Sequence, residues 1–569
     1  MDDNPSFCPG RLHPALISFF SLLIFVALFF ARALDDTRFT SWELLTAADA
    51  TRILTALTVG MLFVYLTLKV SLPERYPAAF LFLFSFSAAA LFFSEPEAVV
   101  DASRYFTYAK NIELYGLGQF IREWGHDINV WTDMPFVPLL YGLLFRYAGE
   151  SRLYIQCLTA LLFSATVVLT YLTGRALWDR DTGFIGGLLL MGIPYLFSQV
   201  PLMLVDVPTM FFLALSVYTF ISAIEKGGYM IPVSAFSIAA TFYVKYSTWI
   251  TLSVLPVIVL VYAFEITGPA RRAALIRALQ VFVMAAAGVY IFFAYKQDVM
   301  SRQMRLLVDY QGPGLRRWGE SLFAIFMFQV HPVITAAAVF ATYRAVRKRD
   351  FKFLIISWLV FLVLALRIRR VRYIMILFPM LSLMASYGLR QLANRMPVKY
   401  TALCITAFSL AVAFFGFHPY LLKDSSMNLA KAGAFLDSLP GDSVEVLTAG
   451  SPGSEVNPAV SVSVLDLYTK KRIIYRYHPA QQPVREVLLK SPLRFTWEYR
   501  NPKYYDENPK YDERSATPDK AGPVAIIYSD SDYIPAPGTA EKIKGLRSKV
   551  FNATDNRYEY QSLVAVYYR

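Results

Sequence analysis

Two aspartates in an otherwise apolar chain are the first residues whose type and position suit chemistry. Asp101 lies in a long segment, residues 94–133, that is rich in acidic and aromatic side chains and separates two apolar runs. Asp206 opens a later apolar run in the sequence VPLMLVDVPTMFF. A carboxylate at the edge of a hydrocarbon layer is costly and is therefore a candidate functional group. Each also has an ordinary interpretation, Asp101 as a solvated loop carboxylate and Asp206 as the cap of a helix.

Basic residues also occur at the ends of later apolar runs. Lys245 interrupts the sequence TFYVKYSTW, and Arg370 and Arg372 lie in the cluster RIRRVR. Short loops rich in Lys and Arg normally face the cytoplasm, which leaves these cations on the opposite side. The planar fork of arginine suits phosphate oxygens, so we interpret the pattern as a phosphate site. A fringe of basic side chains at lipid head groups is the alternative. The basic short loops are residues 265–277, 344–352 and 390–399.

The composition identifies the elements that must position these residues. Of 569 residues, 56% are hydrophobic and only 17% are charged, and the mean hydropathy is +0.42. A soluble protein carries about 25% charged residues. We therefore predict a polytopic α-helical membrane protein with about 12–13 transmembrane helices. The net charge of +13 comes from loops between spans and does not indicate nucleic-acid binding. The three cysteines lie far apart and form no disulfide framework.

One apolar run is predicted to stop short of a full crossing. The segment 134–148 is short and contains Pro135, Pro138 and Arg146. If it does not span the bilayer, Asp101 and Asp206 lie on the same face. The other runs are 14–32, 53–72, 77–93, 153–173, 183–200, 207–223, 229–244, 247–264, 276–295, 321–343, 353–366, 373–388 and 400–420.

The composition divides the chain into three parts. Residues 1–76 contain extra N-terminal spans, residues 77–423 form the main membrane domain, and residues 424–569 contain no run of membrane length. The last part alternates strand-like and helix-like segments, which predicts a soluble α/β domain. We expect this domain to be extracytoplasmic, on the same side as residues 94–133, and the protein to be a multi-pass protein of the plasma membrane. The candidate strands are 444–448, 472–477, 524–529 and 563–568, and the candidate helices are 429–439 and 540–547.

Six segments, in order, resemble a known family. The run DASRYFTYA (101–109) resembles the first acidic motif of the GT-C membrane glycosyltransferases, and MPFVPLLYGLLFRYAG (134–149) resembles their Pro-Pro-Leu segment. The branch in question contains the protein O-mannosyltransferases and the lipid A aminoarabinose transferases. The resemblance spans residues 77–390 and does not extend to the C-terminal domain. The other matching segments are 174–194, 201–212, 240–255 and 370–383.

The resemblance implies an inverting glycosyltransferase that moves a sugar from a polyprenyl-phosphate carrier to an acceptor hydroxyl on the outer face of the membrane. A carboxylate would take the acceptor proton, and fixed cations would stabilise the charge that develops on the leaving phosphate. Asp101 is then the base, and Asp206 orients the acceptor or binds sugar hydroxyls. The sugar and the acceptor, whether protein, lipid or glycan, stay open. The candidate substrate-binding residues are Arg104, Tyr105, Lys245, Arg370, Arg372 and Tyr373.

The sequence leaves the cofactor unknown. Many members of the family have Asp-Glu where this chain has Asp101-Ala102, so a divalent cation is possible but not required. His126 and Asp127 are adjacent but too few to form a metal site, so no metal ligands are predicted. The predicted partners are the lipid-linked donor, the acceptor and the lipid bilayer.

Three other functions fit parts of the sequence. An envelope glycan polymerase or ligase with a diphosphate-linked donor would also need an outer phosphate site. A lipid-glycan transporter or flippase would be expected to show broken helices related by an internal repeat, and the sequence contains no such repeat. A membrane scaffold whose C-terminal domain binds a partner would not need Asp101, so loss of activity in a properly inserted Asp101→Asn variant would count against it.

Overall fold

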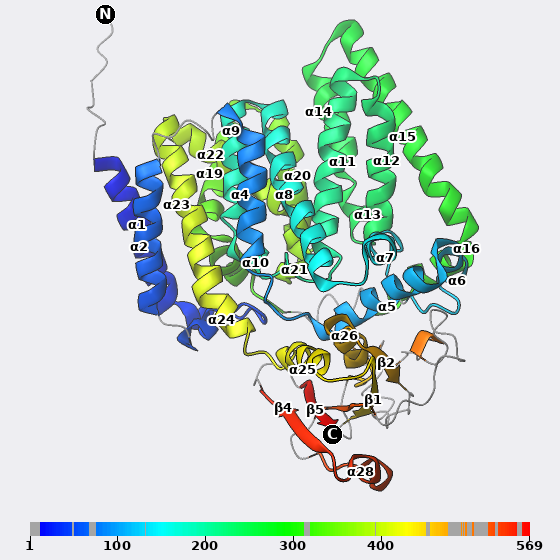
Figure 1. Cartoon of the computed structure of the whole chain (residues 1–569). Coiled ribbons are helices and arrows are strands. Elements are labelled where there is room, and N and C mark those ends of the chain that lie inside the picture. Colours follow the sequence, from blue (N-terminus) through cyan, green and yellow to red (C-terminus); the bar gives the residue numbers. More distant parts are fainter. Residues whose placement is uncertain are drawn as a thin grey trace, which may run out of the picture.

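The protein is a bundle of helices with a small α/β domain at one end (Figure 1). Its structure is a computed structural model. The residues that it describes are 12–47, 50–67, 75–130, 133–311, 319–392, 394–450 and 456–475, followed by 491, 493, 496–497, 503–505, 522–529, 533–554 and 560–569.

Seven helices among the described residues are long and apolar enough to cross a membrane, and a bent pair adds an eighth span. Five shorter apolar helices accompany them, which confirms a polytopic helical membrane protein. The long helices are α2 (Ala50–Thr67), α8 (Arg152–Leu177), α11 (Asp206–Lys226), α13 with α14 (Thr248–Thr251, Val254–Glu265), α15 (Gly268–Tyr295), α21 with α22 (Val371–Ile374, Phe378–Leu392) and α23 with α24 (Arg395–Ala411, His418–Leu421). The shorter helices are α1 (Leu12–Phe30), α4 (Pro77–Ala90), α7 (Phe136–Ala148), α12 (Met230–Val244) and α20 (Lys352–Ala365).

The span predicted for residues 321–343 is a bent pair of helices and not one straight helix. Helix α18 (Leu322–Ala324) and the π-helical turn η4 (Ile325–Val330) are followed by α19 (Pro332–Lys348) at an angle of 115°. Pro332 has no N–H to donate to the preceding turn, so the helix restarts there. The ring of His331 accepts the N–H of Val333 at 3.1 Å and caps the new helix.

Helix α7 is too short for a full crossing, as predicted. Its 13 residues extend about 20 Å, which is less than the roughly 30 Å of a hydrocarbon core. The helix packs against α5 (Val99–Tyr115) at the end of the bundle that carries the α/β domain (Figure 1). Asp101, in α5, and Asp206, at the start of α11, both lie at this end.

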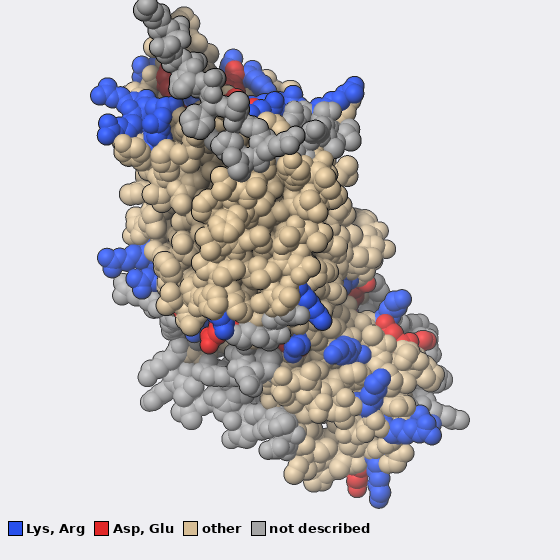
Figure 2. All heavy atoms as spheres, turned by 90° about the vertical axis from the view of Figure 1, so that its left-hand side faces the viewer, with Lys and Arg blue, Asp and Glu red and all other residues tan. Residues whose placement is uncertain are grey.

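Charged side chains leave a broad belt of the bundle nearly free. Figure 2 shows Lys and Arg gathered above and below an uncharged surface. Exposed side chains of α1 and α2, which face this view, include Phe19, Phe20, Leu62 and Phe63. A surface of this kind matches the hydrocarbon core of a bilayer. The loops α8–α9 (α9, Arg180–Met191) and α14–α15 lie at the end opposite α5 and the α/β domain (Figure 1).

The segment 94–133, which the sequence suggested to be a loop, is mostly helical. Helix α5 is followed by α6 (Leu117–Glu123), and Gly116 between them has a positive φ of 85° that glycine adopts without strain. The buried residues of α5 recur at helical spacing, so the helix has one inward face. They include Ala102, Tyr105, Phe106, Ala109 and Ile112.

The C-terminal part forms the predicted α/β domain. Its sheet has the order β2-β1-β3-β5-β4, in which β1 pairs in parallel with β2 and β3, and β5 pairs antiparallel with β3 and β4. Helix α26 packs on α5 and joins this domain to the membrane bundle. The strands are β1 (Ser443–Ala449), β2 (Arg472–Tyr475), β3 (Val524–Tyr528), β4 (Arg547–Phe551) and β5 (Leu563–Tyr568), and the helices are α25 (Met427–Ser438), α26 (Val460–Tyr468) and α28 (Pro537–Ile543).

Two elements of this domain differ from the prediction. The sequence analysis did not anticipate α26 or β4, and it placed Arg547, the first residue of β4, in a helix. The side chains of β4 are mostly exposed, so the strand lacks the apolar alternation by which strands are recognised. Residues 476 and 477 of the predicted strand 472–477 lie outside the described residues.

Candidate active site

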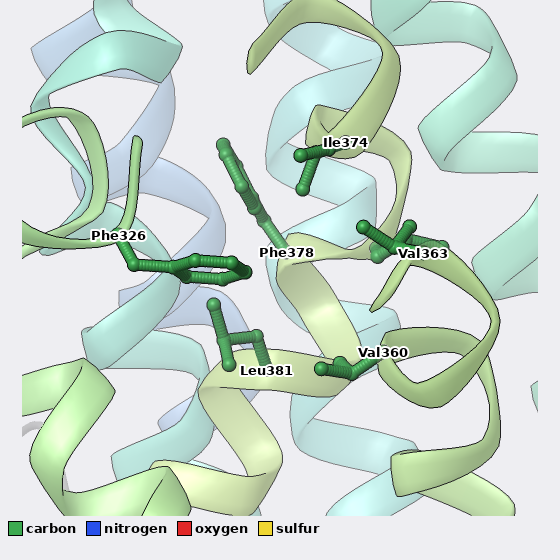
Figure 3. Close-up of a pocket in the computed structure, with 7 residues that line it drawn as sticks. Phe326, Val360, Val363, Ile374, Phe378 and Leu381 are labelled. Atoms are coloured by element: carbon green, nitrogen blue, oxygen red, sulfur yellow. The ribbon is translucent and has the colours of Figure 1, made fainter. Parts of the chain in front are cut away.

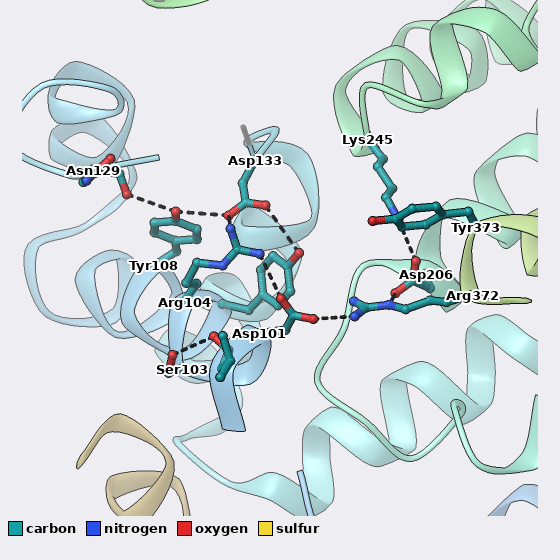
Figure 4. A network of polar contacts seen from close by, with 12 residues as sticks. Asp101, Ser103, Arg104, Tyr108, Asn129, Asp133, Asp206, Lys245, Arg372 and Tyr373 are labelled. Carbon is teal, nitrogen blue, oxygen red and sulfur yellow. Dashed lines mark hydrogen bonds and ion pairs between the residues drawn. The ribbon is translucent and has the colours of Figure 1, made fainter. Parts of the chain in front are cut away.

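Arg372 joins the two aspartates that the sequence analysis singled out. Its guanidinium binds the carboxylate of Asp101 through Nη1 and that of Asp206 through Nε, the latter at 2.6 Å (Figure 4). The Asp206 side chain is 1% exposed and the Arg372 side chain 13%. Solvent therefore screens these ion pairs only weakly. Residues far apart in the sequence thus form one charged group at the end of the bundle.

Lys245 is the second cation on Asp206. Its Nζ lies 2.6 Å from Oδ1 of Asp206, whereas Arg372 binds Oδ2. The same ammonium lies 5.3 Å from the centre of the Tyr373 ring, within the range of a cation–π contact. Arg370 lies 4.9 Å from that ring centre and donates to the Tyr373 hydroxyl at 3.1 Å. The structure thus places the four candidate substrate-binding residues from later spans in one cluster.

Asp133 is a third carboxylate of the site, and the sequence analysis missed it. The guanidinium of Arg104 lies between two carboxylates. Its Nη1 is 3.1 Å from Oδ2 of Asp133, and its Nη2 is 3.1 Å from Oδ1 of Asp101. The hydroxyls of Tyr105 and Tyr108 donate to Asp133 at 3.4 and 3.2 Å (Figure 4). Two tyrosines three residues apart lie on the same face of a helix. The spacing of these two tyrosines in α5 was the feature of the sequence that could have indicated a shared hydrogen-bond acceptor.

The two site carboxylates outside the spans differ in acidity. Burial alone would raise the pKa of Asp101, but the guanidinium groups of Arg372 and Arg104 lower it below its ordinary value. Burial raises the pKa of Asp133 above its ordinary value, because Arg104 offsets only part of the effect. Asp101 is therefore an anion while it holds both arginines, and it becomes a stronger base when one of them leaves.

Breaks at helix ends bring these charges together. Asp101 lies in the first turn of α5 and Asp206 is the first residue of α11, positions where the helix dipole favours a carboxylate. Lys245 follows the last residue of α12 in an extended conformation, with φ at −160°. Arg372 lies in the short helix α21, ahead of the long helix α22. The site is therefore fixed by rigid helices and still lies at the edge of the bundle.

The arrangement provides fixed cations beside carboxylate oxygens. All eight site residues predicted from the sequence belong to this network, which Asp133 and Tyr108 complete. Such a site can hold an anion at the cations and accept a proton at a carboxylate. Among the residues that the structure describes, no group of three or more His, Cys, Asp and Glu side chains is arranged to hold a metal ion.

One wall residue of a small apolar cavity is close in sequence to the arginines of the site. Ile374, which follows Arg372 by two residues, belongs to its wall. The wall has only hydrocarbon side chains, which suit an apolar group better than water. Helices α20 and α22 and the turn η4 provide Phe326, Val360, Val363, Phe378 and Leu381 (Figure 3), and Leu377, which precedes α22, completes the wall.

One family model matches part of the chain. The dolichyl-phosphate-mannose-protein mannosyltransferase family matches residues 133–296. This part contains Asp133, Asp206 and Lys245, while Asp101 and Arg372 lie on either side of it. Comparison with curated protein sequences finds no match.

Solved structures show the same fold at low sequence identity. The ArnT protein from Cupriavidus metallidurans in the apo state aligns with a TM-score of 0.55 and 10% identity, covering 87% of this chain and 98% of ArnT. ArnT bound to undecaprenyl phosphate aligns with a TM-score of 0.52 and 12% identity, covering 86% and 98%. The archaeal oligosaccharyltransferase AglB from Archaeoglobus fulgidus, in complex with an inhibitory peptide and a dolichol-phosphate, reaches a TM-score of 0.46 at 11% identity, covering 80% and 70%. The chain thus shares the fold of ArnT, and its residues 133–296 match the dolichyl-phosphate-mannose-protein mannosyltransferase family, in agreement with the resemblance that the sequence motifs indicated.

Proposed function

We propose that the protein transfers a sugar from a polyprenyl-phosphate carrier to an acceptor hydroxyl on the outer face of the membrane, with inversion at the sugar carbon. The observation that carries the proposal is the pairing of Arg372 and Lys245 with Asp101 and Asp206 at one end of the bundle. The ArnT structure of similar fold is bound to undecaprenyl phosphate, a lipid that carries the same phosphate group.

The donor phosphate competes with the carboxylates for the cations. Its oxygens match the fork of Arg372, and Lys245 adds a second positive charge. Arg370 and the Tyr373 hydroxyl lie beside them and complete the phosphate site.

The transfer itself needs a base and a stabilised leaving group. The acceptor hydroxyl attacks the anomeric carbon from the face opposite the phosphate, and its proton passes to the carboxylate of Asp101. The bond between the anomeric carbon and the phosphate oxygen breaks, and the electron pair stays on the phosphate, where Arg372 and Lys245 stabilise it. Because the phosphate draws Arg372 away from Asp101, donor binding makes Asp101 more basic. Asp206 orients the acceptor or binds sugar hydroxyls, and Arg104 and Tyr105 hold the acceptor side of the site.

The orientation follows from the positions of the basic loops. The short basic loops lie at the end of the bundle opposite the site, and the positive-inside rule assigns them to the cytoplasm (Figure 1). The site and the C-terminal domain, residues 424–569, are then extracytoplasmic, and the protein is a multi-pass protein of the plasma membrane. Residues 77–423 form the catalytic membrane domain, and residues 1–76 add α1 and α2 to its side.

The test is sugar transfer by the purified protein in lipid nanodiscs, with a panel of radiolabelled polyprenyl-phosphate sugars. We expect the wild type to release free polyprenyl phosphate and the Asp101→Asn variant not to do so. Equal turnover by both would place the base elsewhere, and Asp206→Asn and Asp133→Asn would then be compared. Turnover with diphosphate-linked donors alone, or with none of the donors, would overturn the proposal. The same assay with and without EDTA decides whether a divalent cation takes part.

A further inference from the structure

A buried ion pair beside the site, Glu97–Arg152, has no part in the mechanism above. Glu97 lies in the linker between α4 and α5, four residues before Asp101, and its side chain is 0% exposed. Nε of Arg152, the first residue of α8, lies 2.9 Å from Oε1 of Glu97. Oε2 of Glu97 accepts the backbone N–H of Met203 at 2.8 Å. Met203 lies three residues before Asp206, so one carboxylate contacts both segments that carry the site aspartates.

We propose that Glu97 is a positioning residue that sets the separation of Asp101 and Asp206 for the transfer reaction. The proposal rests on the proposed function, because it assigns the separation a role in sugar transfer. Arg372 contacts both aspartates, so their carboxylates must lie as far apart as one guanidinium spans. A misplacement of about 1 Å can lower a rate on the order of 100-fold.

The segment that carries Met203 needs such an anchor. Residues 198–205 are buried but form turns and bends instead of a regular helix. The N–H groups of Leu202 and Leu204 are bonded to backbone carbonyls, whereas that of Met203 is bonded to the Glu97 side chain. A buried N–H without an acceptor is costly. The carboxylate of Glu97 provides a charged acceptor for the Met203 N–H and thereby fixes the turn that leads into Asp206.

Arg152 holds the other side of this connection. Its guanidinium donates Nη1 to the carbonyl of Phe93 at 2.9 Å and Nη2 to the carbonyl of Glu95, in addition to its bond with Glu97. Gln156, one turn further along α8, donates to the same Phe93 carbonyl at 2.8 Å. The linker is thus attached to α8 at several points just before α5 begins, which fixes the position of Asp101.

The C-terminal domain contacts both members of the pair. The hydroxyl of Tyr468, at the end of α26, accepts the backbone N–H of Glu97 at 2.9 Å. Its ring centre lies 5.4 Å from the guanidinium carbon of Arg152, as in a cation–π contact. Tyr468 therefore adds one contact to Glu97 and one to Arg152. The domain therefore contributes to the geometry of a site that it does not itself line.

Glu95 provides a matched control in the same linker. It is 1% exposed, like Glu97, but its carboxylate lies 3.2 Å from Nδ1 of His418 on α24. In the part of the chain that the structure describes, no hydrogen bond or ion pair joins the Glu95 carboxylate to residues 198–206. Glu95→Gln and Glu97→Gln thus make the same substitution at similar burial, and only Glu97→Gln alters the contact with the Asp206 segment.

The experiment measures transfer kinetics and amide hydrogen exchange of both variants in nanodiscs. For Glu97→Gln we expect kcat to fall on the order of 10- to 100-fold with the donor KM changed less than about twofold. We also expect faster exchange in peptides that cover residues 198–210. Glu95→Gln should match the wild type in both readouts. An unchanged kcat in Glu97→Gln, or equal losses of kcat in the two variants, would overturn the proposal.

Two further outcomes separate failure of this proposal from failure of the proposed function. If the wild type transfers no sugar, the proposed function fails, and the role of Glu97 in positioning a transfer site fails with it. If the wild type is active and exchange at residues 198–210 is unchanged in Glu97→Gln, only the positioning role fails. Should Glu97→Gln not fold, Tyr468→Phe replaces it, because it removes one hydrogen bond to Glu97 and keeps the ring. A smaller fall in kcat is then expected, and an unchanged kcat would contradict the proposal.

Discussion

Replacement of Arg372 by lysine isolates the shape of the guanidinium from its charge. The guanidinium makes one charge-assisted contact to Asp101 and a second, of 2.6 Å, to Asp206. A lysine ammonium is a point charge that keeps at most one of these contacts. A charge-assisted hydrogen bond contributes about 1.5–3 kcal/mol, and loss of one donor aimed at a developing charge lowers kcat about 10²–10³-fold. We expect Arg372→Lys to reduce kcat by at least about 100-fold.

The assay is the initial rate of polyprenyl-phosphate release at saturating acceptor. Arg302→Lys is the control, because Arg302 lies in α16 (Gln297–Leu306), is 51% exposed and pairs with Asp298. It should leave kcat within about twofold, since exposed pairs contribute less than about 1 kcal/mol. A rate for Arg372→Lys within about threefold of the wild type, equivalent to less than about 1 kcal/mol, would refute the reasoning. The leaving phosphate would then be held elsewhere.

Three predictions concern stability, each measured by thermal unfolding in detergent. Lys110→Met should cost about 3–5 kcal/mol and release the C-terminal domain to proteolysis, because Lys110 of α5 lies 2.5 Å from the buried Asp466 of α26; a domain that stays protected would contradict this. Gly183→Ala should destabilise by at least about 1–3 kcal/mol, since its Cβ would lie 2.2 Å from the Tyr171 carbonyl, whereas Gly118→Ala meets open space and should be neutral. Burial raises the pKa of Glu95 from 4.5 to about 7, so the folded state binds a proton that the unfolded state releases, and stability should fall by up to about 3 kcal/mol as the pH rises from 4.5 through 7. The Glu95→Gln variant should lack this part of the pH dependence, and a flat wild-type profile would count against it.

The sequence was informative where a charge stood in an unusual place. Asp206, Lys245 and Arg372 interrupt or end apolar runs, and few ordinary roles place an ionisable group there. Asp101 was identified by the motif around it. The structure connects these four residues directly. The approximate limits of the apolar helices were also predictable, because length and apolarity alone define them. Among the described residues, seven or eight of these helices are long enough to cross a membrane and five are shorter.

The sequence was uninformative where the role of a residue depends on a partner that is distant in the sequence. Asp133 and Glu97 read as ordinary acidic residues of a polar segment, and their burial becomes visible only with Arg104 and Arg152 in place. The run predicted over residues 321–343 crosses Pro332, and the 115° bend there became apparent only in the structure. Strand β4 has no apolar alternation and takes its structure from the pairing with β5.

The position of Arg372 in the chain governs when the protein becomes competent. A chain is made and begins to fold from its N-terminus, and Arg372 follows Asp206 by 166 positions and Asp101 by 271. Until it is synthesised, the two carboxylates have no shared cation, and a donor phosphate meets net negative charge. Under the proposed function, fragments that end before α21 lack Arg372 and should be unable to transfer the sugar.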